Sequence, residues 1–292
     1  MGVEKLILGT VQMGLEYGIN NKSGQIRRED AFEILHVAHA SGIDTLDTAE
    51  VYGNAHQLIG VFHRQNPNVV FKINTKLPAN STSSQYEERI SRYLDELGVH
   101  QIETLMFHSY AGFETHAALL PVLEKSKSKG LFKYLGVSLY ENSELAEIIR
   151  ESSVDVIQLP FNVLDNLNQK AGLLEVARST HKIIHTRTAF LQGLFFAGRT
   201  EGVAQELSAE LETIEFLASQ YGISVESLAL GYCLYQPTID RVLLGVDSVK
   251  QLERNIQASR YSLPEAAVHQ INTIKVKKTN LLNPAKWPKK HS

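Results

Sequence analysis

Short apolar segments rich in β-branched residues alternate along this chain with longer segments in which apolar residues recur at helical spacing. Each short segment suits one buried strand, and each longer segment suits one amphipathic helix. This alternation is typical of βαβ units, which build a parallel sheet. We predict strands at Lys5–Gly9, Ile43–Asp47, Val70–Thr75, Thr104–His108, Tyr134–Ser138, Asp155–Leu159, Lys182–Arg187 and Val242–Val246. We predict helices near 29–41, 54–65, 84–97, 115–129, 142–151, 165–179, 203–236 (broken) and 249–258.

A strand followed by a helix, repeated around a closed sheet, is the plan of a TIM barrel. The rival is an open, doubly wound sheet, which normally carries a Gly-x-Gly-x-x-Gly motif after its first strand. Residues 8–14 read Leu-Gly-Thr-Val-Gln-Met-Gly instead. We therefore predict the α/β class and a (β/α)8 TIM barrel, with residues 1–292 forming a single domain.

The composition of the chain argues against nucleic acid and membranes as partners. The chain has 292 residues, a formal net charge of −3 and 43% hydrophobic residues, so it can bury a large core and has no basic excess for nucleic acid. No apolar run is long enough for a membrane span, the first residues do not resemble a signal peptide, and Cys233 is the only cysteine. We expect a cytoplasmic protein with no nucleic-acid or membrane partner; the oligomeric state is not readable.

The C-terminal segment 275–292 is basic and contains Trp287. One interpretation is a solvated end. The other is that Trp287 folds over the barrel mouth and lines a substrate pocket.

Polar residues stand at the ends of three successive predicted strands. Asp47 ends the second strand, Lys76 follows the third and His108 ends the fourth, while Tyr52 lies five residues beyond Asp47. The carboxyl ends of barrel strands face the active-site mouth. Each residue alone has an ordinary structural explanation, such as a helix cap or a packed ring. Their conjunction indicates one chemical site.

Such a group suits proton delivery to an alkoxide that forms as hydride reaches a carbonyl carbon. A tyrosine has a pKa of about 10, so we expect the ammonium of Lys76 to lower the pKa of Tyr52. Asp47 would keep Lys76 charged and in place, and His108 would hold the carbonyl oxygen. These roles predict reduction of an aldehyde or ketone.

The motif Asp-Thr-Ala-x-x-Tyr-Gly at 47–53, with a lysine after the next strand and a histidine after the one beyond, resembles the aldo-keto reductase superfamily. The resemblance extends from the first strand to Asn255. It implies that Asp47, Tyr52, Lys76 and His108 are the catalytic tetrad, with Tyr52 as general acid. It also implies an NAD(P)H-dependent oxidoreductase acting on a small-molecule carbonyl.

The resemblance also implies positions for the nicotinamide end of the cofactor. Gly9, Thr10 and Val11 resemble a first-strand loop that contacts the nicotinamide ribose. Ser138 matches a residue that holds the carboxamide, but Leu139 replaces the asparagine that usually follows. Gln158 matches a second carboxamide contact. Its alternative is a buried glutamine satisfied by the backbone.

Further cofactor positions follow the seventh strand. Arg187 falls where relatives often stack an aromatic ring on the nicotinamide, and a guanidinium plane can stack similarly. Its alternative is a salt bridge inside the barrel rim. The backbone of Phe190, Leu191, Gln192, Gly193 and Leu194 matches the pyrophosphate loop.

The choice between NADP(H) and NAD(H) falls to the loop before the last helix. The resembling positions are Asp247, Ser248, Gln251 and Asn255, the last at the adenine contact. Many relatives carry arginine where Asp247 stands, and a carboxylate repels a 2′-phosphate. Lys250 and Arg254 are near enough to compensate if the loop turns differently. We predict a weakened NADP preference, which leaves both NADP(H) and NAD(H) open as the cofactor.

Two other function classes compete with a carbonyl reductase. One branch of the superfamily consists of regulatory subunits that bind NAD(P)H, and no extra N-terminal segment indicates such an assembly here. A metal-dependent hydrolase would need clustered ligands, whereas the 11 histidines are scattered, so no metal site is predicted. Since only a short segment follows Asn255, an open mouth favours a sugar-like or small aliphatic carbonyl.

Overall fold

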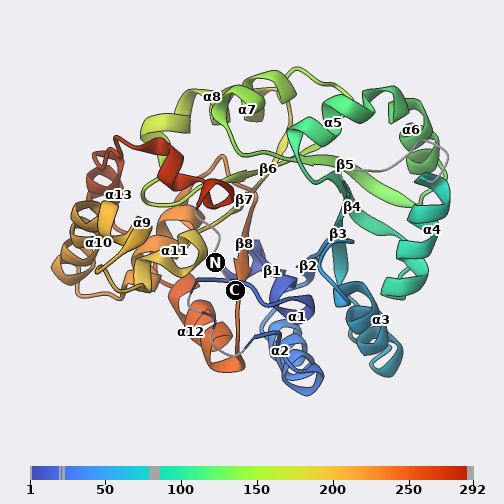
Figure 1. Ribbon diagram of the computed structural model, residues 1–292, viewed down its shortest axis with the longest axis horizontal. Helices are drawn as coiled ribbons and strands as arrows, with labels where there is room; N and C mark the ends of the chain where they lie inside the picture. The colour runs from blue at the N-terminus through green and yellow to red at the C-terminus, as the bar shows by residue number, and fades with distance from the viewer. Residues whose placement is uncertain (1, 20, 22–23, 79–85, 288–292) are drawn as a thin grey trace.

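The computed structural model describes residues 2–19, 21, 24–78 and 86–287 and shows a closed barrel of parallel strands surrounded by helices (Figure 1). Neighbouring strands pair in chain order, and β8 pairs with β1 to close the barrel. The predicted (β/α)8 fold is therefore confirmed, with strand ends shifted by a few residues. The strands are β1 Leu6–Gly9, β2 Thr45–Asp47, β3 Lys72–Leu77, β4 Ile102–Phe107, β5 Phe132–Ser138, β6 Val156–Pro160, β7 Ile183–Arg187 and β8 Arg241–Gly245.

The helices form a ring outside the strands (Figure 1). They are α1 Val11–Gly14, α2 Arg28–Ala40, α3 Ala55–Gln65, α4 Tyr86–Leu97, α5 Tyr110–His116, α6 Leu120–Ser128, α7 Asn142–Ile148, α8 Leu167–Ser179, α9 Gly202–Glu206, α10 Ser208–Gln220, α11 Val225–Tyr235, α12 Val249–Ser259 and α13 Glu265–Asn272. Short 3₁₀ turns complete the list: η1 Val3–Lys5, η3 Ala117–Leu119, η4 Leu191–Phe196, η5 Thr279–Leu282 and η6 Pro284–Lys286.

Helix boundaries show where the sequence pattern was insufficient. The continuous helix predicted over 115–129 is wrong, because α5, η3 and α6 divide it, and α6 begins at Leu120 with Pro121 in its first turn. Proline suits a first helical turn because it has no N–H to donate. The break predicted within 203–236 is confirmed as α9, α10 and α11. Residues 84–85 of the predicted helix 84–97 lie outside the described residues.

Strand residues alternate between the helices and the barrel lumen, as a two-residue period requires. On β3, Ile73 is fully buried beneath the helices, whereas Asn74 and Lys76 line cavities inside the barrel. Interior positions of a TIM barrel are usually occupied by bulky branched residues. This lumen is unusually polar, and its polar residues divide between the two ends of the barrel.

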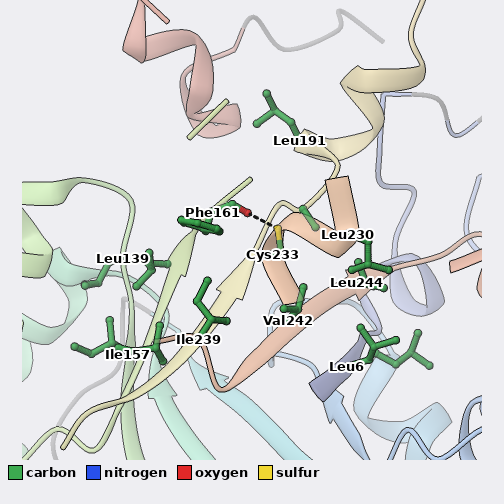
Figure 2. Close-up of a cluster of buried hydrophobic side chains, with 14 of the residues drawn as sticks. Leu6, Leu139, Ile157, Phe161, Leu191, Leu230, Cys233, Ile239, Val242 and Leu244 are labelled. Carbon is green, nitrogen blue, oxygen red and sulfur yellow. Dashed lines mark hydrogen bonds between the residues drawn. The ribbon is translucent and has the colours of Figure 1, made fainter. Parts of the chain in front are cut away.

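The hydrophobic core lies between the strands and the ring of helices. Figure 2 shows part of it, where Phe161 lies beside the Cys233 side chain of α11, and Leu139 and Ile157 lie farther away in the same cluster. The Cys233 thiol lies 3.6 Å from the Phe161 carbonyl oxygen, and the Phe161 ring stacks on Tyr232 at 5.4 Å. Burying one such large apolar side chain contributes about 1.5–3 kcal/mol. This layer fixes the strands on which the site is built.

The described part of the C-terminal segment, which ends at Trp287, packs at the rim of the barrel. The Trp287 indole donates to the Leu281 carbonyl oxygen at 2.8 Å, and Trp287 does not line the central pocket. Lys286 and Asn283 both bond to Glu141 at the start of α7. Of the two interpretations of this segment, the one in which Trp287 lines the pocket is therefore wrong. Residues 288–292 of the predicted basic tail lie outside the described residues.

Among the helices within the described ranges, none combines the length and the apolar character that a bilayer crossing requires.

Candidate active site

A pocket of about 210 Å³ opens at the carboxyl ends of the strands. Asp47 from β2, Lys76 from β3 and His108 directly after β4 all line it, together with Tyr52 from the loop between β2 and α3. The residues predicted from three successive strand ends therefore converge on one cavity.

At the base of the pocket Asp47 and Lys76 form a buried ion pair. The Lys76 ammonium contacts Asp47 Oδ1 and donates to the Thr48 carbonyl oxygen at 3.1 Å. The other carboxylate oxygen, Asp47 Oδ2, accepts from the Gln158 amide at 2.8 Å. Both charged side chains are only 2% exposed. Because every charge here has a partner, the pair is rigid and electrically neutral as a unit.

The Tyr52 ring stands above this pair. Its centroid lies 5.9 Å from the His108 ring, nearly perpendicular to it, and 5.5 Å from Lys76 Nζ. A Cβ added to Gly14 would lie 1.8 Å from the Tyr52 carbonyl oxygen. Only glycine permits α1 to approach so closely. The loop that carries the tyrosine is thus held against the loop that follows β1.

The protonation of Tyr52 differs from the sequence prediction. Burial, and next the Asp47 carboxylate, raise the pKa of Tyr52 above its ordinary value, while Arg187 opposes the rise. The expected lowering by Lys76 is wrong because Lys76 is engaged by Asp47 and lies over the ring face. Tyr52 therefore keeps its proton at neutral pH.

His108 is neutral in this site. Burial, then the charges of Lys76 and Arg187, lower the pKa of His108 to about 3. A neutral imidazole has one N–H donor and one acceptor nitrogen. His108 can therefore donate one hydrogen bond into the pocket without adding a charge.

The loop after β7 borders the opposite wall and holds an uncommon backbone. Thr188, Leu191 and Gln192 have φ values of 64°, 46° and 55°, in the left-handed region that disfavours side chains. Such strain persists where the surroundings impose it, typically at binding sites. The Gln192 amide donates to the Tyr17 hydroxyl at 2.6 Å, which joins this loop to the segment after α1. Tyr17 and Gln192 both line the pocket.

Most positions predicted to hold a cofactor line this same pocket, namely Gly9, Thr10, Val11, Ser138, Gln158, Arg187, Phe190, Gln192, Gly193, Asp247 and Gln251. Four others do not. Leu191 and Leu194 are buried beneath the β7 loop, Ser248 caps α12 by accepting from the Gln251 N–H, and Asn255 is buried on α12.

The carboxamide positions offer a test of whether a nicotinamide fits. Gln158 Oε1 is buried and has no hydrogen-bond partner in the part of the chain that the structure describes. Since Gln158 bonds through its amide nitrogen to Asp47, the alternative of a glutamine satisfied by the backbone is wrong. An unpartnered buried acceptor beside Ser138 suits the amide N–H of a carboxamide. Leu139 makes no such contact, because its side chain lies in the core (Figure 2).

Arg187 ends β7 and faces the pocket. Its guanidinium donates to the Leu139 carbonyl oxygen at 2.8 Å, and its central carbon lies 4.2 Å from the centroid of the Tyr140 ring. It forms no ion pair with any described residue, so the predicted alternative of a salt bridge at the rim is wrong.

Several pocket residues were missed from the sequence, among them Gln12, Tyr17, Tyr140 and Gly245. They lie on loops or at the ends of short elements, where no periodicity marks them. One signal was available for Tyr140, because it follows β5 at the same rim as Ser138.

Within residues 2–19, 21, 24–78 and 86–287, no three His, Cys, Asp or Glu side chains gather as a metal ion would require.

The class of protein follows from comparison with known families. Residues 5–276 match the family model described as the aldo/keto reductase family. The chain therefore belongs to this family and is an NAD(P)H-dependent oxidoreductase.

Similar curated proteins are reductases and dehydrogenases. An NADH-specific methylglyoxal reductase of Escherichia coli (strain K12) is 23% identical over 84% of this chain and 87% of its own length. A D-threo-aldose 1-dehydrogenase of Pseudomonas sp is 22% identical over 86% of this chain and 90% of its own. An aldo-keto reductase of Bacillus halodurans, solved in its holo form, matches the fold with a TM-score of 0.75 at 19% identity, over 92% and 91% of the two chains.

Proposed function

We propose that this protein reduces a small aldehyde or ketone to an alcohol, with Tyr52 as general acid and Asp47, Lys76 and His108 as its catalytic partners. The observation that carries this proposal is the convergence of a protonated tyrosine, a neutral imidazole and a buried ion pair on one pocket. Such a set donates protons and hydrogen bonds without competing negative charge.

The reduced nicotinamide cofactor supplies the hydride when bound. Gln158 Oε1 and Ser138 would hold its carboxamide, and Gly9, Thr10 and Val11 would lie along its ribose. The backbone from Phe190 to Gly193 would lie along the pyrophosphate, and Gly193, with a φ of 88° and no Cβ, leaves room for a phosphate to come close to the loop.

The proton balance follows from the state of Tyr52. The carbonyl carbon gains the hydride, the electron pair of the C=O π bond moves to oxygen, and that oxygen takes the proton of the Tyr52 hydroxyl. An alkoxide approaches the basicity of hydroxide, whose conjugate acid has a pKa of about 15.7. A tyrosine with a raised pKa therefore still transfers its proton readily. The phenolate then recovers a proton from solvent.

His108 acts on the same oxygen from the other side. Its ring stands 5.9 Å from that of Tyr52, so one carbonyl oxygen can lie between the two donors. Because His108 is neutral, it stabilises the developing charge by a preorganised hydrogen bond and leaves proton donation to Tyr52.

We propose that NADH is the preferred cofactor. Asp247 lines the pocket, whereas Lys250 and Arg254 do not. A carboxylate there repels a 2′-phosphate and accepts from a 2′-hydroxyl. The similar reductase of Escherichia coli is named as NADH-specific, in keeping with this preference.

Titration of the protein with NADH and NADPH tests the cofactor choice. We expect a lower dissociation constant for NADH, and a shift toward NADPH in Asp247→Arg. Glu253→Arg is the matched control, since Glu253 is exposed on α12 and does not line the pocket. A strong NADPH preference in the unaltered protein would contradict the proposal.

A panel of carbonyl compounds, assayed with both cofactors, tests the reaction itself. We expect turnover of small aliphatic or sugar-like carbonyls, the types named for methylglyoxal reductase and aldose dehydrogenase relatives. Absence of turnover across the panel, despite cofactor binding, would overturn the proposed activity.

A further inference from the structure

One positive charge in the pocket has no carboxylate partner among the described residues, and neither does the one carboxylate there that is not paired with Lys76. The charged residues lining it, among those described, are Asp47, Lys76, Arg187 and Asp247. Asp47 and Lys76 neutralise each other, and Asp247 stands after β8 beside Gln251, whose side chain bonds to the Asp247 N–H at 2.6 Å. The guanidinium of Arg187 is left as the uncompensated charge at the catalytic end.

The fold holds this guanidinium in a fixed position. The carbonyl oxygen of Leu139 accepts a hydrogen bond from the Arg187 guanidinium, and the ring of Tyr140 covers one face of that guanidinium. A guanidinium has further N–H donors in a planar fork that matches a carboxylate or phosphate. With a single hydrogen bond to the described residues, Arg187 retains donors for a ligand.

The charge of Arg187 reaches the reacting groups. It contributes to lowering the pKa of His108 and opposes the raised pKa of Tyr52. It also acts on Asp165, but that carboxylate is already paired with Lys170 in a buried ion pair. Arg187 lines the same pocket as Tyr52 and His108, and it forms no ion pair with Asp165.

We propose that Arg187 binds an anionic group of the substrate, so that the enzyme prefers carbonyl compounds bearing a carboxylate or phosphate near the carbonyl. A half-buried cation without a counter-charge has lost hydration that an anionic ligand restores through charge-assisted hydrogen bonds. This inference rests on the proposed function and specifies its substrate class.

The family resemblance implies a different role for Arg187, which is stacking on the nicotinamide ring. A cation beside a nicotinamide ring disfavours the positively charged oxidised form by simple repulsion. A cofactor phosphate could also engage the guanidinium, since its chemistry is the same as that of a substrate phosphate. The experiment must therefore separate substrate from cofactor.

The first measurement is a specificity ratio. We compare kcat/KM for glyceraldehyde 3-phosphate against glyceraldehyde, and for succinic semialdehyde against butanal, in the unaltered protein and in Arg187→Gln. In each pair, the specificity ratio is kcat/KM for the anionic substrate divided by kcat/KM for the neutral one. We expect this ratio to exceed one in the unaltered protein. For the pair with the higher ratio, we expect it to fall about 10–100-fold in Arg187→Gln. Arg187→Lys, which keeps the charge but not the fork, should retain part of the preference.

Arg28→Gln is the matched control, because Arg28 is exposed at the start of α2 and does not line the pocket. This variant should keep both ratios of the unaltered protein. The pair that gives the larger ratio identifies phosphate or carboxylate as the preferred anion. Equal ratios near one in the unaltered protein and in Arg187→Gln would overturn the inference.

Binding measurements separate this inference from the proposed activity. Calorimetric titration with inorganic phosphate and with succinate, neither of which can be reduced, should show binding that Arg187→Gln loses. If this binding occurs while no carbonyl is reduced, the proposed activity fails and the anion site stands. If Arg187→Gln weakens NADH binding tenfold or more while the specificity ratio is unchanged, the guanidinium serves the cofactor and the inference is overturned.

Discussion

The two ends of the barrel lumen are built from the same strands, but their buried polar groups differ in the hydrogen-bond partners that they have. At the carboxyl end, the charged groups of Asp47 and Lys76 are bonded to each other, and the unpartnered atoms Gln12 Oε1 and Gln158 Oε1 line the pocket in which a cofactor would bind. At the amino end, buried polar atoms of Asn74, Thr104 and His185 have no partner in the described part of the chain. These three side chains line a second cavity of about 180 Å³.

A separation of two residues along a strand is enough to place a side chain in one cavity or the other. Asn74 and Lys76 are two residues apart on β3, as are His185 and Arg187 on β7, and each pair divides between the two cavities. An unsatisfied buried polar group costs about 1–3 kcal/mol. We therefore expect the carboxyl end to hold polar residues positioned for chemistry, and the unpartnered groups of the amino end to lower the stability of the fold.

The strongest test of this comparison removes one hydroxyl from the carboxyl end. Tyr52→Phe should reduce kcat about 10²–10⁴-fold, because the general acid is lost while the ring still packs. The matched variant is Tyr134→Phe, whose ring lines the amino-end cavity and should leave kcat unchanged. Steady-state kinetics on the best carbonyl of the panel decides the matter. Turnover in Tyr52→Phe within about threefold of the unaltered protein would remove Tyr52 from its proposed role.

A second test measures what the buried ion pair contributes to stability. Lys76→Met leaves the Asp47 carboxylate buried without its cation and should lower the free energy of unfolding by about 3–5 kcal/mol. Lys72→Met is the control on the same strand, since Lys72 pairs with Asp44 at half-exposed positions. That change should cost less than about 1 kcal/mol. Equal losses in urea denaturation would contradict the distinction between the two ends.

A third test concerns pH and the amino end. Burial, then the charge of Arg241, lower the pKa of His185 from 6.5 to about 3. The unfolded chain therefore binds a proton at His185 below pH 6.5 that the folded protein does not, so stability falls as the pH falls through this window. Each pH unit costs up to about 1.4 kcal/mol.

From pH 6.5 to 5, the loss assigned to His185 is about 2 kcal/mol. His185→Asn should lack this part of the decline, which urea titrations at each pH would measure against the unaltered protein. Parallel pH dependence in the two proteins would show that His185 is protonated equally in both states.

The smallest expected effect comes from Thr104→Val, which removes an unpartnered hydroxyl without changing the shape of the side chain. Stability should stay level or rise by about 1 kcal/mol, with activity unchanged. Thr75→Val is the contrast, because the Thr75 hydroxyl bonds to His56 at 2.8 Å and its loss should destabilise. A loss in Thr104→Val as large as in Thr75→Val would indicate a partner, such as ordered water, in the amino-end cavity.

The sequence predicted the features that periodicity and strand ends encode. Asp47, Lys76 and His108 could be placed together because parallel strands bring their carboxyl ends to one rim. Tyr17 could not, since it lies on a loop whose path depends on tertiary contacts such as the bond to Gln192. Tyr140 was missed although it follows β5 at the same rim as Ser138.

The electrostatics were also beyond the sequence. The positions of Tyr52 and Lys76 in the sequence indicate that the two residues are close. The direction in which the pKa of Tyr52 shifts, however, depends on its burial and on the ion pair between Lys76 and Asp47. Likewise, Arg187 could be assigned to the rim, whereas the contacts with Leu139 and Tyr140 appear only in three dimensions.

The alternation along β3 also limits how the length of this chain can change. Loss of one residue between Lys72 and Lys76 would turn every later side chain to the opposite face, which would bury the ammonium of Lys76 against the helices and point Leu77 into the lumen. Loss of two residues would keep the faces but shift the lysine along the barrel axis by about 7 Å. Insertions and deletions among homologues should therefore be confined to the loops, and an alignment that places a gap inside β3 would be misaligned.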